Sequence, residues 1–192
     1  MTGRTHDLAA FTALTATVAY FPLTEMTLAT AIVAFTANMV GALAPDIDQT
    51  TSSIWEKVRF GRILSGIVSP LFGKHRFLSH SLVGLVLFAI GVRFLLGLIG
   101  AVLLVDMNIV WISFMIGFIS HLLTDMLTRD GIPLLFPFPI KFGIPPIRAF
   151  RIKTKGFAEK SIIFPGLILL NMYIFYMNYE KFLEFFREYL IR

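Results

Sequence analysis

The sequence predicts an all-α, polytopic helical membrane protein with about five membrane helices and a polar site at one membrane face. The composition is 56% hydrophobic and 15% charged, with a mean hydropathy of +0.77, whereas soluble domains have about 45–50% apolar and about 25% charged residues. Five apolar stretches approach or reach the length that crosses a bilayer, and ionisable residues gather at their ends. The 192 residues fit a single domain, residues 1–192, because domains commonly contain about 100–200 residues.

Each predicted span is an apolar stretch that ends at a turn or a charged segment. The first is short and rich in threonine, and the second follows so closely that the two predict a helical hairpin. The third is the clearest span, the fourth returns after a tight turn, and the fifth leads into an amphipathic C-terminal segment. The five spans are residues 8–21, 26–44, 82–105, 109–127 and 162–179.

The distribution of lysine and arginine predicts the orientation. Counting the spans from the N-terminus puts residues 1–7, 45–80 and 128–161 on one side, and the two long loops there are rich in Lys and Arg. The turns on the other side carry Glu25 and Asp106 but no Lys or Arg. The positive-inside rule makes the first side cytoplasmic, in a multi-pass protein of the inner (cytoplasmic) membrane.

The net charge of +5 has an alternative explanation in nucleic-acid binding, because a basic balance supplies electrostatic affinity for phosphates. The basic residues, however, lie in loops between apolar spans, where membrane orientation accounts for them. We therefore expect membrane lipid and no nucleic acid as a partner, and the oligomeric state is left open.

Two loop segments are predicted to lie at the membrane surface. In residues 52–72, apolar residues such as Trp55, Ile63 and Ile67 alternate with basic ones, which is typical of a helix lying in the interface. A loop packed on the helix bundle is the alternative. Residues 136–150 contain too many prolines for a helix and are expected at headgroup level.

All four histidines fall where the predicted topology sends them to the same membrane face. His6 begins the first span, His75 and His80 precede the third, and His121 lies near the end of the fourth. Chance would scatter them between the two faces, so this distribution indicates a site.

Aspartates accompany these histidines. Asp46 and Asp48 end the second span, and Asp125 follows His121 by four residues. Positions i and i+4 of a helix share a face, so His121 and Asp125 can point at a single ion. Ionisable groups inside a membrane span are costly and usually mark a functional site.

Each of these features has a simpler explanation when it is taken alone. His121 and Asp125 can form a hydrogen-bonded pair, the segment APDID can be a turn with a helix cap, and Ser79 can cap the third span. Because the spans return all of these fragments to one membrane level, we predict a metal site. The predicted metal ligands are His6, Asp46, Asp48, His80, His121 and Asp125.

The chain has no cysteine, so only nitrogen and oxygen ligands are available. Imidazole and carboxylate suit one or two divalent ions, with zinc favoured and manganese or iron as alternatives. Such a centre can activate water for hydrolysis of a phosphoester. His75 and Asp130 are catalytic candidates, as general acid or base or as residues that orient the ligands. Lys74, Arg76 and Arg129 are candidates for binding a substrate phosphate, although membrane orientation explains each basic residue alone.

Four motifs resemble the YdjM-like family of LexA-regulated, membrane-bound, metal-dependent hydrolases. They are THDLAAF at residues 5–11, GALAPDID at 41–48, HRFLSHS at 75–81 and GFISHLLTDMLTRDGIPLLFPFPIKFG at 117–143. The resemblance implies an integral membrane protein with a hydrolase-type metal site. The chain is also distantly similar to the zinc-dependent phospholipase C and nuclease superfamily, whose metal ligands follow a similar order.

The sequence analysis favours a membrane-bound metal-dependent hydrolase that acts on a phosphoester, with a lipid or lipid-linked substrate as one option. The alternative is a non-enzymatic membrane protein that binds or transports metal, because intramembrane His and Asp residues also build ion pathways. A third option is a structural protein in which the polar cluster only ties helix ends together.

Overall fold

A computed structural model describes residues 1–21, 26–52, 54–55, 59–72, 77–100 and 104–190. The all-α class is confirmed, because the described part of the chain forms seven α-helices with short 3-10 and π segments, and no β-strand is found there. Four helical segments are long and apolar enough to cross a membrane. They are Leu28–Asp48, Leu82–Ile99, Met107–Met126 and Glu159–Met177.

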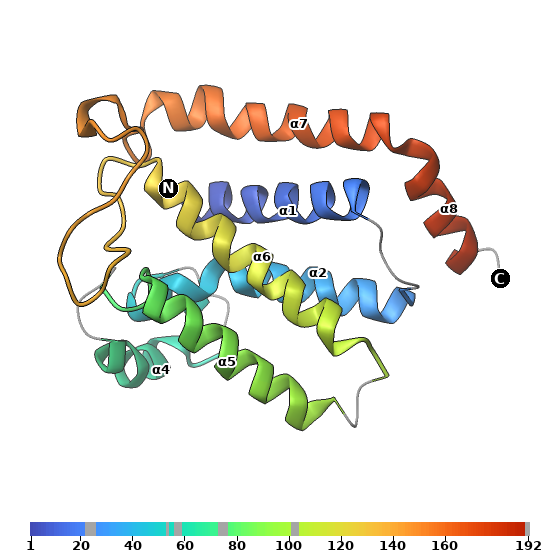
Figure 1. Cartoon of the computed structure of the whole chain (residues 1–192), viewed down its shortest axis with the longest axis horizontal. Coiled ribbons are helices and arrows are strands. Elements are labelled where there is room, and N and C mark those ends of the chain that lie inside the picture. Colours follow the sequence, from blue (N-terminus) through green and yellow to red (C-terminus); the bar gives the residue numbers. More distant parts are fainter. Residues whose placement is uncertain (22–25, 53, 56–58, 73–76, 101–103, 191–192) are drawn as a thin grey trace.

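The helices α1, α2, α5, α6 and α7 run back and forth roughly lengthwise through the molecule (Figure 1), so that successive ones are antiparallel, with α1 and α6 between α7 on one side and α5 on the other. The 3-10 segment η1 (Ala44–Asp48) extends α2, and the π-helical segment η4 (Glu159–Ile163) leads into α7. The seven α-helices are α1 (Gly3–Tyr20), α2 (Leu28–Leu43), α4 (Gly61–Val68), α5 (Leu82–Ile99), α6 (Met107–Met126), α7 (Phe164–Met177) and α8 (Tyr179–Leu190).

The first predicted span is the helix α1, which is not among the four apolar segments. It carries Arg4 and Asp7 in its first turns and is rich in threonine. These threonines are satisfied within the bundle: Thr15 donates to Asn171 Oδ1 at 2.9 Å, and Asn171 Nδ2 donates to Thr12 Oγ1 at 2.6 Å. Hydrogen bonds of this kind join helices where water is absent, and here they join α1 to α7.

Helices α2 and α6 cross at very close range. A methyl group at Gly41 would lie 2.1 Å from the carbonyl oxygen of Phe114, and one at Gly117 would lie 2.1 Å from that of Asn38. Small residues allow membrane helices to approach in this way. The Asn38 side chain donates to the Ser113 carbonyl at 3.1 Å and fixes the relative position of the two helices.

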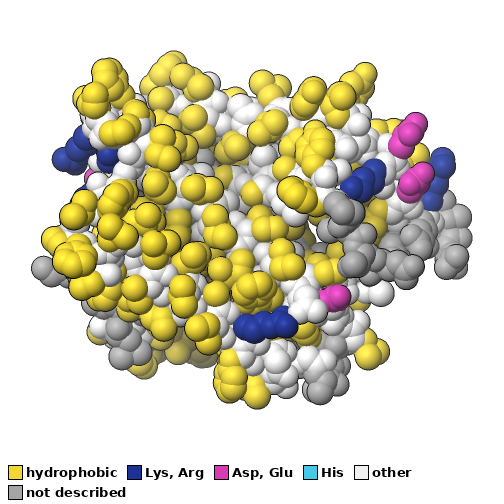
Figure 2. Space-filling model, viewed as in Figure 1, with side chains coloured by type: hydrophobic (Ala, Val, Ile, Leu, Met, Phe, Trp, Pro, Cys, Tyr) yellow, Lys and Arg dark blue, Asp and Glu magenta, His cyan; other side chains and the backbone are white. Residues whose placement is uncertain are grey.

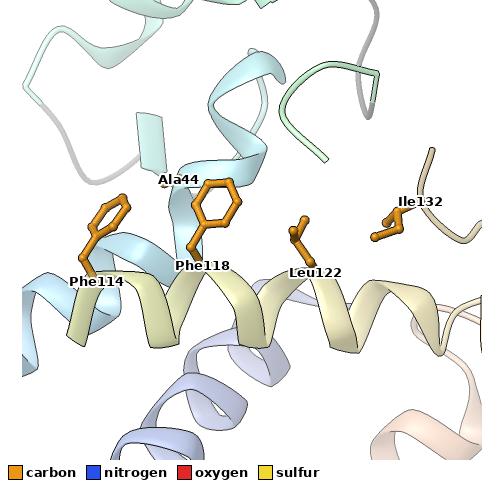
Figure 3. Close-up of a cluster of buried hydrophobic side chains, with 5 residues drawn as sticks. All are labelled: Ala44, Phe114, Phe118, Leu122 and Ile132. Atoms are coloured by element: carbon orange, nitrogen blue, oxygen red, sulfur yellow. The ribbon is translucent and has the colours of Figure 1, made fainter. Parts of the chain in front are cut away.

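One side of α6 forms the centre of the core. Phe114, Phe118 and Leu122 follow each other at four-residue spacing and point toward Ala44 and Ile132 (Figure 3). All five side chains are buried. The apolar row on α6 thus reaches the segment where α2 ends and η1 begins.

The segment that follows α6 is irregular, as its prolines predict. It contains isolated bridges between Thr128 and Ile152 and between Ile132 and Phe142, and one 3-10 turn, Arg148–Phe150. The buried Arg151 guanidinium donates to the carbonyl oxygens of Pro145 and Pro146, both at 2.7 Å. These hydrogen bonds connect the end of the proline-rich segment to its middle and stabilise the conformation of the loop.

The surface suits a membrane environment. Hydrophobic side chains are spread over the whole face in Figure 2, and Lys and Arg side chains occur there only at scattered places. Exposed apolar side chains on α5, such as Ile90, Phe94 and Leu98, are 63–65% exposed. In water an apolar surface of this extent would be unfavourable.

Candidate metal centre

The ends of the helices bring five of the predicted ligands together. Their ligand atoms form two overlapping groups that share His121. One group is His6, His121 and Asp125, and the other is Asp46, His80 and His121; within each group the ligand atoms lie within 4.8 Å of one another. Each residue comes from a different part of the chain except His121 and Asp125, which share α6.

Local structure explains why these side chains face inward. His121 and Asp125 continue the buried side of α6 beyond Phe114 and Phe118, so the apolar row ends in two ionisable groups. Asp46 lies in η1, where the chain tightens after α2. His80 lies just before α5, which is capped by the side chain of Ser81 accepting from the Gly84 N–H at 3.1 Å. The alternative that Ser79 caps this helix is therefore wrong.

The distances between imidazole nitrogens and carboxylate oxygens are those of atoms that can share a metal ion. His80 Nε2 lies 3.5 Å from Asp46 Oδ1 and 3.6 Å from Asp125 Oδ2, and His121 Nε2 lies 3.6 and 3.8 Å from the same two oxygens. Neighbouring ligand atoms around a tetrahedral zinc, with bonds near 2.0–2.2 Å, are about 3.3–3.5 Å apart. A direct N–H···O hydrogen bond would be about 2.7–3.2 Å long.

His6 approaches the other side of the same carboxylate, with its Nε2 atom 3.3 Å from Asp125 Oδ1. Its ring stacks on that of His121, with centroids 3.8 Å apart and planes 9° from parallel. Asp125 thus presents one oxygen to His6 and the other to His80 and His121, an arrangement in which a carboxylate can bridge two ions. The N-terminal amine of Met1 also contacts Asp125 Oδ1, at 2.5 Å.

Hydrogen bonds at Nδ1 determine the tautomers of His121 and His6. His121 Nδ1 lies 2.6 Å from the carbonyl oxygen of Ala42, which can only accept, so Nδ1 carries the hydrogen. His6 Nδ1 lies 2.7 Å from Thr124 Oγ1. The hydroxyl of Thr124 donates to the carbonyl oxygens of Ser120 and His121 at 3.0 and 2.9 Å, so it accepts from His6. In the neutral form of either ring, Nε2 therefore carries the lone pair, and it is the atom that faces the centre.

His80 is held through a relay of two side chains. Ser79 Oγ donates to Asp48 Oδ2 at 2.6 Å and lies 3.0 Å from His80 Nδ1. Because the serine hydrogen is committed to the carboxylate, its oxygen accepts from His80 Nδ1–H. Metal-binding histidines in proteins usually have such a partner on the second nitrogen, which fixes the ring and raises its basicity.

Burial makes the cluster costly unless its charge is compensated. The three imidazoles and Asp125 are buried, whereas the side chain of Asp46 is 25% exposed. Two carboxylates in such surroundings need positive charge. The Met1 amine supplies some at Asp125 Oδ1, and a divalent cation among the imidazoles would supply the rest. The His and Asp groups can therefore bind a metal, and Asp46 is the member that reaches the outside.

Three further residues predicted for the site, Asp48, Asp130 and Arg129, fall within the described part of the chain. Asp48 supports His80 through Ser79 and is in neither ligand group of the described residues, so its role as a direct ligand stays a prediction. Asp130 is exposed and lies 3.9 Å from Arg148, and exposed Arg129 donates to the Arg151 carbonyl at 3.4 Å. His75, Lys74 and Arg76 lie outside the described residues.

The sequence analysis missed Glu159, a buried carboxylate at the start of η4. Its Oε1 accepts from Thr2 N at 2.6 Å, Thr2 Oγ1 at 2.9 Å and Thr5 Oγ1 at 2.8 Å, and its Oε2 accepts from Lys155 N at 2.7 Å. Glu159 thereby fixes the first turn of α1, which carries His6. A signal was available, because Glu159 is the only acidic residue between Asp130 and Glu180.

These features define a class, a helical membrane protein with a buried His and Asp cluster where its helices end. The chain belongs to the YdjM inner membrane protein family, which it matches over residues 1–182. This finding confirms the resemblance drawn from the four sequence motifs.

Two relatives illustrate the relationship. The protein YvsG of Bacillus subtilis (strain 168) is 37% identical over 180 residues, which are 94% of this chain and 98% of YvsG. The inner membrane protein YdjM of Escherichia coli (strain K12) is 35% identical over 108 residues, 54% of this chain and 48% of that protein. No solved structure matches the chain. The similarity to the zinc-dependent phospholipase C and nuclease superfamily stays a prediction.

Proposed function

We propose that this chain is a multi-pass membrane-bound hydrolase that depends on a divalent metal and acts on phosphoesters. The metal ligands are His6, Asp46, His80, His121 and Asp125, and the centre faces the cytoplasm. This orientation follows from the excess of Lys and Arg in the loops on the same side as the cluster.

The observation that carries the proposal is the state of His121. Its Nε2 atom is buried and makes no hydrogen bond among the described residues, although it lies 3.6 and 3.8 Å from oxygens of two carboxylates. A neutral imidazole lone pair facing carboxylate oxygens is repulsive, so this position favours a cation. Three imidazoles and two carboxylates suit zinc best, with manganese or iron as alternatives.

Hydrolysis is supported by the composition and accessibility of the cluster. A divalent ion bound there would supply Lewis acidity and activate water near neutral pH. Asp46, as the partly exposed member, marks the side on which a substrate can approach. Arg129 and Asp130, and Lys74, His75 and Arg76 outside the described residues, remain candidates for binding substrate and for proton transfer.

The experiment is elemental analysis of detergent-purified protein beside His121→Ala, followed by a screen of phosphomonoesters, phosphodiesters and phospholipids. We expect stoichiometric metal in the wild type, its loss in the variant, and turnover that chelation abolishes. Equal metal content in both proteins would refute the ligand assignment. Stoichiometric metal without turnover of any substrate would favour a non-enzymatic metal-binding or transport protein.

A further inference from the structure

Helix α4 has its apolar side turned away from the protein. Phe60, which precedes the helix, and Ile63, Leu64 and Ile67 are 66%, 65%, 39% and 63% exposed. These positions follow the spacing i, i+3, i+4 and i+7, so they form one stripe along the helix. A helix of a soluble protein would bury such a stripe in its core.

The opposite side of α4 is small and polar, and it packs on the protein. Ser65 is buried, and Gly61 lies against the backbone of Trp55, whose oxygen would be 1.9 Å from a methyl group added there. Trp55 Nε1 and Ser69 Oγ both donate to the carbonyl oxygen of Ile47, each at 3.2 Å. Both ends of the α4 segment are therefore attached to η1, the segment that carries Asp46.

The α4 segment also carries two basic side chains, and one of them lies against the apolar stripe. Arg59 and Arg62 are both exposed, and the Arg59 guanidinium lies 5.3 Å from the centre of the Phe60 ring. An apolar stripe with one arginine against it and a second exposed arginine on the same helix is complementary to the boundary between acyl chains and anionic headgroups.

A second copy of the chain is a weaker candidate for covering this stripe. Stable protein interfaces bury about 800 Å² on each partner and involve about 20–30 residues a side. The stripe on α4 offers four side chains. A lipid surface has no such minimum and accommodates a short helix directly.

We infer that α4 lies embedded in the interface of a leaflet with anionic phospholipids. It thereby holds Asp46, the partly exposed member of the metal centre, at headgroup depth. Because α4 is attached to η1, the partly exposed Asp46 opens toward the headgroup layer. The substrate is accordingly the phosphoester of a membrane phospholipid, approached from the bilayer. This last step rests on the proposed function, whereas the placement of α4 does not.

The placement is tested by spin labelling, which the absence of native cysteines makes simple. Single variants Ile63→Cys, Ile67→Cys, Arg62→Cys and Gly66→Cys are labelled with a nitroxide in nanodiscs of phosphatidylglycerol and phosphatidylcholine. Electron paramagnetic resonance then compares the access of oxygen, which enters lipid, with that of a water-soluble nickel chelate.

We expect labels at 63 and 67 to be accessible to oxygen and shielded from nickel, with the opposite at 62 and 66. Nickel access at 63 and 67 would overturn the placement of α4. Shielding of 63 and 67 from both reagents would also overturn it, because it would mean that protein covers the stripe.

The substrate class is tested by comparing turnover of nanodisc phosphatidylglycerol with that of bis-p-nitrophenyl phosphate, a soluble phosphodiester. In the double variant Ile63→Glu/Ile67→Glu, we expect the ratio of lipid to soluble turnover to fall at least about tenfold, because two carboxylates in place of apolar side chains weaken the attachment of α4 to an anionic leaflet. An unchanged ratio would overturn the lipid assignment. No turnover of either substrate by the wild type would contradict the proposed function, and the spin labels would still decide where α4 lies.

Discussion

The Nδ1 atom of His121 donates a hydrogen bond to the carbonyl oxygen of Ala42 over 2.6 Å, from α6 to the end of α2. This contact joins the two helices that cross most closely and also fixes which nitrogen of His121 faces the cluster. Packing and ligand geometry are therefore coupled, and the predictions below use this coupling.

Removing a shared ligand should cost more than removing an unshared one. His121 belongs to both ligand groups, whereas Asp46 belongs to one. We expect His121→Ala to abolish metal binding, because it breaks both groups, and Asp46→Asn to weaken it while leaving residual binding at the intact group of His6, His121 and Asp125. Titration of apo-protein with zinc, followed by calorimetry, measures both. Equal zinc affinity in the two variants would contradict the shared role of His121.

The hydroxyl of Thr124 should tune the centre without touching an ion. Thr124→Val keeps the shape of the side chain but removes the acceptor of the His6 Nδ1 hydrogen. Loss of such supporting partners typically lowers metal affinity about 10–100-fold. Thr124→Ser retains the hydroxyl and should restore affinity close to that of the wild type. If the Thr124→Val and Thr124→Ser proteins bind zinc with equal affinity, His6 does not depend on this contact.

Glu159 should stabilise the start of α1 and thereby His6. In Glu159→Gln the amide group replaces one carboxylate oxygen and leaves buried N–H or O–H donors without an acceptor, at a cost of about 1–3 kcal/mol. We expect a lower melting temperature and weaker zinc binding. Glu180→Gln, at an exposed position of α8, is the matched control and should change neither. Similar behaviour of the two variants would remove Glu159 from this role.

The α2–α6 crossing should be intolerant of added volume. Gly117→Val places its side chain against the Asn38 backbone, so α2 has to move away from α6. Overpacking of this kind costs about 1–3 kcal/mol, and the shift separates Asp46 from His121. Gly91→Val on α5, where nothing lies within 4 Å, is the control. Thermal unfolding in detergent with and without zinc should show lower stability and a smaller zinc effect only for Gly117→Val.

Much of this organisation could be predicted from the sequence because membrane helices have a strong compositional signal. Four predicted spans correspond to helical segments long and apolar enough to cross a membrane. The first span is helical but too polar to join them, since its helix α1 also contains Arg4, His6 and Asp7. Its Thr12 and Thr15 are satisfied by Asn171, a partner 156 residues away from Thr15. A hydropathy pattern contains no information about such a distant partner.

The candidate site was partly predictable for the same reason. His121 and Asp125 share a helix face by their spacing, and topology brings His6, Asp46 and His80 to the same end. The hydrogen bonds that orient the imidazoles were not predictable. A serine or threonine such as Ser79 or Thr124 can hydrogen-bond to its own helix, cap a helix or support a distant side chain, and the sequence does not distinguish these cases. Glu159 was missed because its partners, Thr2 and Thr5, lie at the other end of the chain.

X-ray absorption spectroscopy at the metal edge of the purified protein tests the central claim most directly, namely that these imidazoles and carboxylates share a bound cation. For zinc we predict a first shell of nitrogen and oxygen at about 2.0–2.2 Å, with outer-shell scattering from at least two imidazole rings that disappears in His121→Ala. A purified protein whose spectrum shows no bound metal would contradict this claim, and so would a metal whose outer-shell scattering contains no imidazole contribution.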